Sequence, residues 1–133
     1  MSGIKILNKM TKEFIPYNLA LALKELGFDE PCIAFYEPNN EKVMIVGVPQ
    51  KYNNPSLLYV TDFCAPLYQQ VFRWFREKYS LIGEIFSQLR PSNNFMYGFK
   101  IGGSDIIFDG FQTYEEAELA CLKKLIEIVK EKL

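Results

Sequence analysis

Two short turn sequences rich in proline and asparagine, at 38–40 and 91–94, constrain the fold of this chain most. Each lies between two strand-like runs, which are 32–37 and 42–48 around the first turn and 81–89 and 95–101 around the second. Proline fixes φ and asparagine tolerates positive φ, so both residue types favour tight turns. The sequence therefore predicts two antiparallel hairpins.

Three segments carry apolar residues at helical spacing, at 16–26, 66–79 and 113–130. Gly27 is placed to end the first helix, because glycine readily adopts the left-handed conformation that closes a helix. Thr113 and Glu116 form a capping-box sequence at the start of the last helix, in which Thr113 caps the backbone and Glu116 reaches back to it. We expect helices over all three segments.

These elements predict an α+β fold of order αββαββα, with the two hairpins joined into one four-stranded antiparallel sheet and three helices mainly on one face. A length of 133 residues fits a single domain, 1–133, with an irregular N-terminal segment at 1–12. Residues 49–62 are expected to be mostly loop with one extended piece at 57–60, and 106–108 a minor strand. The repeated order of helix and hairpin reflects either an internal duplication or simply an α+β chain with two hairpins.

The composition argues against several classes of function. The chain has no histidine, which excludes Ser-His-Asp and Cys-His triads and any histidine-ligated zinc. A net charge of -1 makes general nucleic-acid binding an unfavourable hypothesis. We expect no enzyme activity, no cofactor and no metal site.

Three cysteines, Cys32, Cys64 and Cys121, match neither a disulfide framework nor a metal-binding spacing. We interpret them as reduced, buried thiols. Cys64 is the best candidate for a reactive thiol, because it precedes a helix N-terminus that would stabilise the thiolate. The sequence contains no secretory signal and no apolar run long enough to span a membrane, so a cytoplasmic protein without membrane association is expected.

The helix at 66–79 carries the most suggestive polar surface. Gln69, Arg73 and Arg76 fall on the side opposite its apolar stripe, and Trp74 falls at the edge of that stripe. Two adjacent guanidinium groups suit a phosphate or a carboxylate, and a tryptophan suits base stacking or an interface anchor. The alternative is an ordinary solvated helix face.

Tyr17 and Leu21 fall on the outer face of the first helix and form a second hypothetical interface. The alternating residues Phe95, Tyr97 and Phe99 point to one side of the predicted sheet. If aromatic side chains on the sheet face away from the helices were exposed, they would form a patch that a homodimer would cover at low cost. We therefore predict self-association.

Three phrases, LALKELGFDEPC (21–32), APLYQQVFRWFREKY (65–79) and TYEEAELACLKKLIEIVK (113–130), resemble small uncharacterised proteins of phages and mobile elements from Bacteroidetes. The resemblance implies an accessory protein of such an element, and it supplies no activity, ligand or catalytic residue. The leading hypothesis is a non-enzymatic protein that binds a host protein or a second copy of itself. The alternative is capture of a small anionic ligand such as a nucleotide.

Overall fold

A computed structural model describes residues 10–53, 61–92, 94–102 and 106–132. Its internal contacts divide the chain into two compact units, Met1–Gln70 (unit 1) and Val71–Leu133 (unit 2). The predicted extended piece at 57–60, and residues 1–9 of the predicted irregular segment, lie outside the described residues.

The described residues of unit 1 include helix α2 (Tyr17–Glu25) and a three-stranded antiparallel sheet. Its strands are β1 (Cys32–Tyr36), β2 (Met44–Gln50) and β3 (Phe63–Cys64). The strand order is β2-β1-β3, so the first strand is central. The turn between β1 and β2 contains Asn39 at a φ of 63°, as expected for the proline-asparagine turn.

The buried face of β1 explains how unit 1 is held together. Side chains alternate along this strand, and Cys32, Ala34 and Tyr36 are buried. The hydroxyl group of Tyr36 donates a hydrogen bond of 2.7 Å to the carbonyl oxygen of Ile15. Burial of the phenol, which favours its neutral form, raises the pKa of Tyr36 to about 12.

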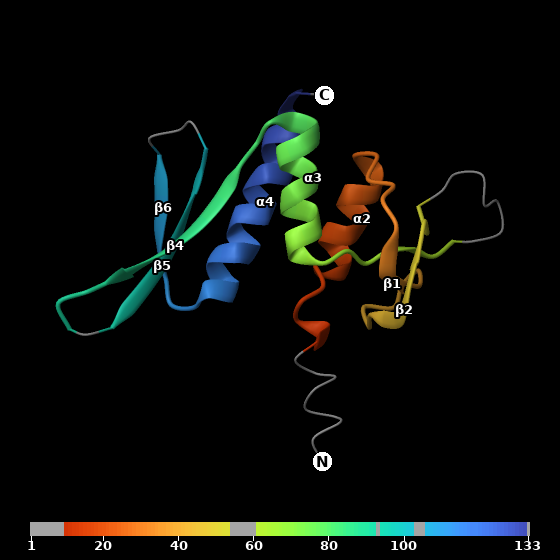
Figure 1. Cartoon of the computed structure of the whole chain (residues 1–133), viewed down its shortest axis with the longest axis horizontal. Coiled ribbons are helices and arrows are strands. Elements are labelled where there is room, and N and C mark those ends of the chain that lie inside the picture. The colour runs from red at the N-terminus through yellow and green to blue at the C-terminus, as the bar shows by residue number, and fades with distance from the viewer. Residues whose placement is uncertain (1–9, 54–60, 93, 103–105, 133) are drawn as a thin grey trace, which may run out of the picture. The chain divides into compact units, whose positions relative to one another are not determined.

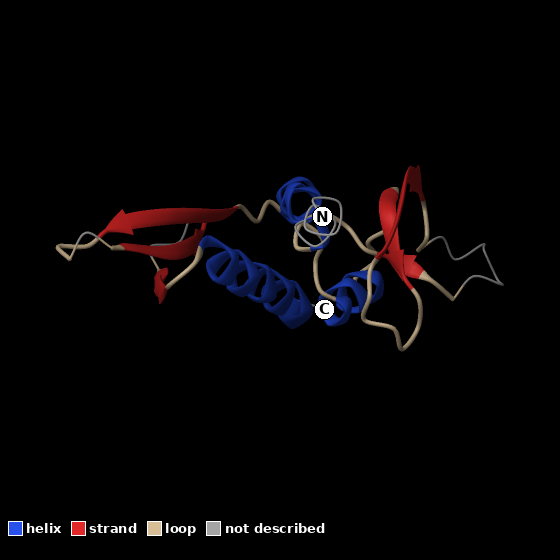
Figure 2. Cartoon of the chain, turned by 90° about the horizontal axis from the view of Figure 1, so that it is seen from below, coloured by secondary structure: helices blue, strands red, loops and turns tan. Residues whose placement is uncertain are grey.

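Unit 2 contains a second three-stranded antiparallel sheet and a long helix, and helix α3 (Tyr68–Tyr79) leads into it from unit 1. The strands are β4 (Gly83–Leu89), β5 (Phe95–Ile101) and β6 (Ile107–Phe111), in the order β4-β5-β6. Helix α4 (Tyr114–Lys132) lies along one face of this sheet (Figures 1 and 2).

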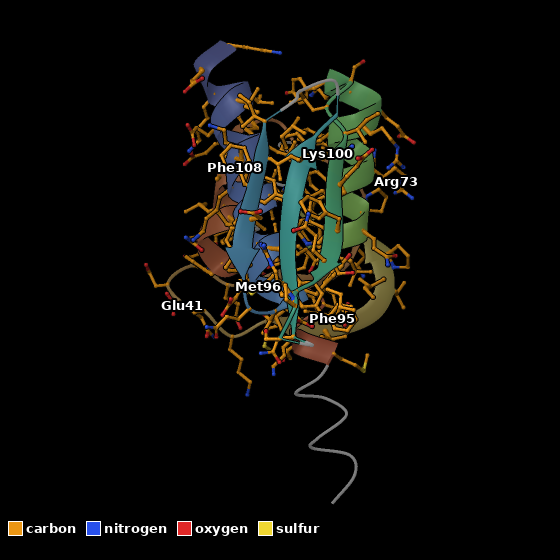
Figure 3. The ribbon with its side chains drawn as sticks, turned by 90° about the vertical axis from the view of Figure 1, so that its left-hand side faces the viewer. Glu41, Arg73, Phe95, Met96, Lys100 and Phe108 are labelled. Carbon is orange, nitrogen blue, oxygen red and sulfur yellow. The ribbon has the colours of Figure 1, made fainter. Side chains whose placement is uncertain are left out.

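The two faces of the unit 2 sheet differ in what covers them. Phe99 and Ile101 are buried on the face toward α4, and Tyr97 on the same face contacts Tyr114 at the start of α4. Figure 3 looks onto the opposite face, where Met96 and Lys100 lie along β5. The predicted alternation of aromatic residues along β5 is thus confirmed; Tyr97 and Phe99 face the helix, and Phe95, on the same side of the strand, is exposed.

The predicted four-stranded sheet is wrong, because the two hairpins belong to separate sheets. Each hairpin takes its third strand from the chain that follows it: β3 pairs with β1, and β6 pairs with β5. The predicted minor strand at 106–108 is therefore a full member of a sheet, as β6. The central strand is the first of its sheet in unit 1 and the second in unit 2, which argues against a simple duplication.

The helix boundaries follow the expected signals. Gly27 has a φ of 93°, and the amide of Phe28 donates to the carbonyl oxygen of Leu23, which closes α2 as a Schellman motif. At the start of α4, the amide of Glu116 donates to Oγ1 of Thr113. The carboxylate of Glu116 accepts from the amide of Gln112 at 3.1 Å, one residue earlier than expected.

Candidate functional site

The polar face of α3 has the composition that the sequence predicts. Gln69, Arg73 and Arg76 are exposed and follow one another at helical spacing. Trp74 is only 5% exposed, and its ring contacts Phe75 at 5.0 Å between centroids. Its indole is therefore placed for packing, whereas stacking on a ligand would need an exposed ring face.

The outer face of α2 is more involved in packing than expected. The ring of Tyr17 contacts Tyr36 at 5.4 Å and Phe63 at 5.2 Å, both edge to face. Its hydroxyl oxygen accepts a hydrogen bond of 2.8 Å from the amide of Asn39. Leu21 is half-buried. Tyr17 therefore connects α2 to the sheet and to the first hairpin turn within unit 1.

Two of the three cysteines lie together in unit 1, which the sequence did not predict. The thiols of Cys32 and Cys64 both donate to the carbonyl oxygen of Glu30, at 3.5 Å and 3.4 Å. The side chain of Asn53 holds the backbone in place, because its Oδ1 accepts from the amide of Cys64 at 2.9 Å. Gln70 closes the cluster by donating to the carbonyl oxygen of Pro31 at 2.8 Å.

The two thiols differ in acidity because an ionised Cys64 can accept a hydrogen bond from the neighbouring Cys32 thiol. The hydrogen bond from Cys32 lowers the pKa of Cys64, and the amides of Tyr52 and Asn53 act in the same direction. The same hydrogen bond and burial raise the pKa of Cys32. Cys64 is therefore the thiol of this pair that ionises first, and it is fully buried. The 32 residues that separate the two positions in the sequence give no spacing signal for the pair.

An exposed apolar surface lies at the end of the β4–β5 hairpin. Leu89 and Phe95 are paired across the two strands and are 62% and 55% exposed. Tyr97 continues the same face of β5, and its ring contacts Tyr114 at 6.3 Å between centroids. We call Leu89, Phe95, Tyr97 and Tyr114 the end patch.

The face of the unit 2 sheet away from α4 is less apolar than the end patch. Phe86 lies over Gly98, where an added Cβ would be 2.7 Å from the Cζ of the ring. Lys100 forms an ion pair of 3.2 Å with Glu84. This arrangement mixes one aromatic ring with paired charges, so this face is not a continuous apolar surface.

Comparison with known protein families, with curated proteins and with solved structures gives no match. Within the described ranges, no helix has the length and apolar character needed to cross a bilayer. The same part of the chain contains no group of three or more cysteine and carboxylate side chains placed to hold a metal ion. The candidate sites therefore depend on the geometry of the chain itself.

Proposed function

We propose that this chain acts by binding another protein, without catalysing a reaction, and that the partner docks on the end patch. The observation that carries the proposal is the exposure of Leu89 and Phe95, two large apolar side chains that face each other across β4 and β5. Covering the exposed part of these side chains in an interface contributes about 25 cal/mol for each Å² of apolar surface removed from water. Tyr97 and Tyr114 extend the patch with rings whose hydroxyl groups can hydrogen-bond to a partner.

The surroundings of the patch favour a particular kind of partner. Glu115 is exposed immediately after Tyr114, in the first turn of α4. An interface with an apolar centre and a charged rim gains specificity from opposite charges at that rim. We therefore expect a partner that presents apolar side chains with a basic residue facing Glu115. The resemblance of the helices to mobile-element proteins leads us to propose a protein of the bacterial host, or a second copy of this chain, as that partner.

Site-specific photocrosslinking tests this proposal. A benzophenone amino acid is placed at Phe95, or at the exposed control position Lys130, in cells that naturally make the chain. We expect a discrete crosslinked product from position 95 and none from position 130. The product should disappear when Leu89→Arg is added. The same products from both positions, or no discrete product from either, would contradict docking at the end patch.

Arg73 and Arg76 favour a second candidate function, the capture of a small anionic ligand such as a nucleotide. Both guanidinium groups belong to the exposed face of α3, three residues apart. A ligand at a hundred times its Kd stabilises a protein by about 2.7 kcal/mol. Thermal-shift measurements with nucleotides should therefore show a rise in Tm that is lost in the Arg73→Glu/Arg76→Glu variant. No rise with any nucleotide at millimolar concentration would exclude this candidate.

A further inference from the structure

The free edge of β4 differs from every other sheet edge in the described part of the chain. β2 has an irregular register with β1, a positive φ of 83° at Gly47, and Pro49, which lacks an amide hydrogen. β3 has two residues. β6 has an irregular register with β5 and a positive φ of 94° at Gly110. Bulges, prolines and short lengths are the devices that prevent sheet edges from pairing with other chains.

β4 carries none of these devices. It pairs with β5 in unbroken register over all seven residues, from Gly83 to Leu89. It contains no proline and no lysine, and its one charged residue is Glu84. The carboxylate of Glu84 is already paired with Lys100 of the same chain. β4 is therefore a regular and nearly uncharged edge strand.

The hydrogen bonds at both ends of the hairpin show which backbone groups of β4 point outward. The amide of Arg90 donates to the carbonyl oxygen of Asn94, and the amide of Gly102 donates to that of Ile82. Backbone groups alternate in direction along an antiparallel strand, so the even-numbered residues of β4 bond to β5. The amides and carbonyls of the odd-numbered residues point to the free edge; these residues are Gly83, Ile85, Ser87 and Leu89.

We infer that β4 pairs with β4 of a second copy, antiparallel, to form a continuous six-stranded sheet across a twofold axis at Phe86. This register pairs Gly83 with Leu89, and Ile85 with Ser87, between the two copies. All the outward-pointing amides and carbonyls of β4 then form hydrogen bonds. A shift of the axis by one residue in either direction leaves one of these residues outside the ladder.

Side chains also fit this register. Phe86 lies opposite Phe86 of the second copy, and each ring leans over Gly98 of its own chain, so the rings leave the two β4 strands free to approach each other. Glu84 lies opposite Gln88 of the second copy, so no like charges face each other within β4. The interface is built mainly from one strand per copy, which predicts a dimer with a Kd in the micromolar range.

The second copy is the occupant that this edge fits best, because antiparallel pairing of a strand with itself is isologous and closes after two chains. The inference adds a partner and a surface to the proposed function. It concerns the backbone edge of β4, whereas docking on the end patch is tested at Phe95, so each can fail without the other.

The test is light scattering during size-exclusion chromatography of the full chain at high micromolar concentration. Wild type should have twice the 15.5 kDa mass of one chain. Ser87→Pro removes an outward amide that β5 does not use, and it should give a monomer with an unchanged circular dichroism spectrum. Ser87→Ala keeps the amide and should remain a dimer. A monomeric wild type, or a Ser87→Pro variant that dimerises as wild type does, would overturn the inference.

Two substitutions of opposite charge at Gln88 test the register separately. They also test the dimer if Ser87→Pro does not fold. Gln88→Glu places a carboxylate opposite Glu84 of the second copy at two symmetric positions, and it should raise the dimer Kd about tenfold. Gln88→Lys places an ammonium group there and should lower the dimer Kd. Shifts of equal size and the same sign, or no shift in either variant, would contradict pairing at Phe86.

Discussion

At the residue scale, Gly98 shows how one missing side chain organises the unit 2 sheet. β6 has one more residue than β5 between the pairs Tyr97–Phe111 and Phe99–Phe108, so it bulges beside Gly98. A Cβ on Gly98 would lie 2.6 Å from the carbonyl oxygen of Phe108 and 2.7 Å from the ring of Phe86. Both distances are shorter than ordinary contacts, so only glycine accommodates the bulge and the ring together.

Gly98→Ala should therefore destabilise the protein. The added methyl group forces the backbone of β6 and the Phe86 ring apart, and overpacking of this kind costs about 1–3 kcal/mol. Urea unfolding measures the free energy of unfolding. Gln88→Ala is a control on the same sheet face, and it should change this free energy by less than about 0.5 kcal/mol. Equal stabilities for the two variants would show that the close approach at Gly98 is relieved without cost.

The thiol pair in unit 1 gives a second prediction at this scale. Cys32→Ala removes the donor that lowers the pKa of Cys64, so the pKa of Cys64 should rise. The ¹³Cβ chemical shift of Cys64, followed by NMR across a range of pH, should show the titration of Cys64 moving to higher pH in this variant. Cys121→Ala is the control, because Cys121 has no part in the pair. An unchanged titration of Cys64 in Cys32→Ala would contradict the proposed donor.

At the element scale, local sequence signals decide where α4 begins. Oγ1 of Thr113 accepts from the amide of Glu116 at 3.1 Å and satisfies one of the free amides of the first turn. Glu115 and Glu116 add negative charge at the positive end of the helix dipole. Helix α4 therefore begins at Tyr114, directly after the capping residue Thr113.

Thr113→Ala should cost about 0.5–2 kcal/mol of unfolding free energy, because the first turn of α4 loses its capping oxygen. Gln112→Ala is a matched control, since Gln112 contributes its backbone amide to the cap. Thermal unfolding should show a lower Tm for Thr113→Ala alone. A similar loss in both variants would mean that the Thr113 side chain has no specific capping role.

The elements were predictable from the sequence, whereas their pairing was not. Turn residues and apolar periodicity locate the hairpins and helices to within a few residues, because these signals act over neighbouring positions. Sheet membership depends on contacts between distant segments. β3 has only Phe63 and Cys64, too short for an alternating pattern, so its pairing with β1 has no local signature.

The candidate sites show the same limit. The polar face of α3 follows from helical spacing alone, and Arg73 and Arg76 are exposed as expected. The depth of Trp74 depends on rings that pack against it, so spacing could not reveal that it is buried. The sequence did not predict the end patch, because Leu89 and Phe95 belong to strands whose apolar residues are typical of a buried sheet face. Their exposure arises where the hairpin is no longer covered.

At the scale of the whole molecule, the surfaces that we assign to association with other chains belong to unit 2. Unit 1 contains a buried pair of thiols and a tyrosine that joins its helix to its sheet. Unit 2 contains the end patch and the regular edge of β4, which are the surfaces we assign to partners. Apolar side chains of this size and an unprotected edge strand both favour binding of another chain.

Native mass spectrometry of the chain purified gently from the cells that make it tests this claim most directly. We expect wild type to be recovered in a complex of defined mass, above the 15.5 kDa of one chain. The Leu89→Arg/Phe95→Arg variant should lose any partner that docks on the end patch, with an unchanged circular dichroism spectrum. Recovery of wild type only as a free single chain would contradict a function based on binding another protein.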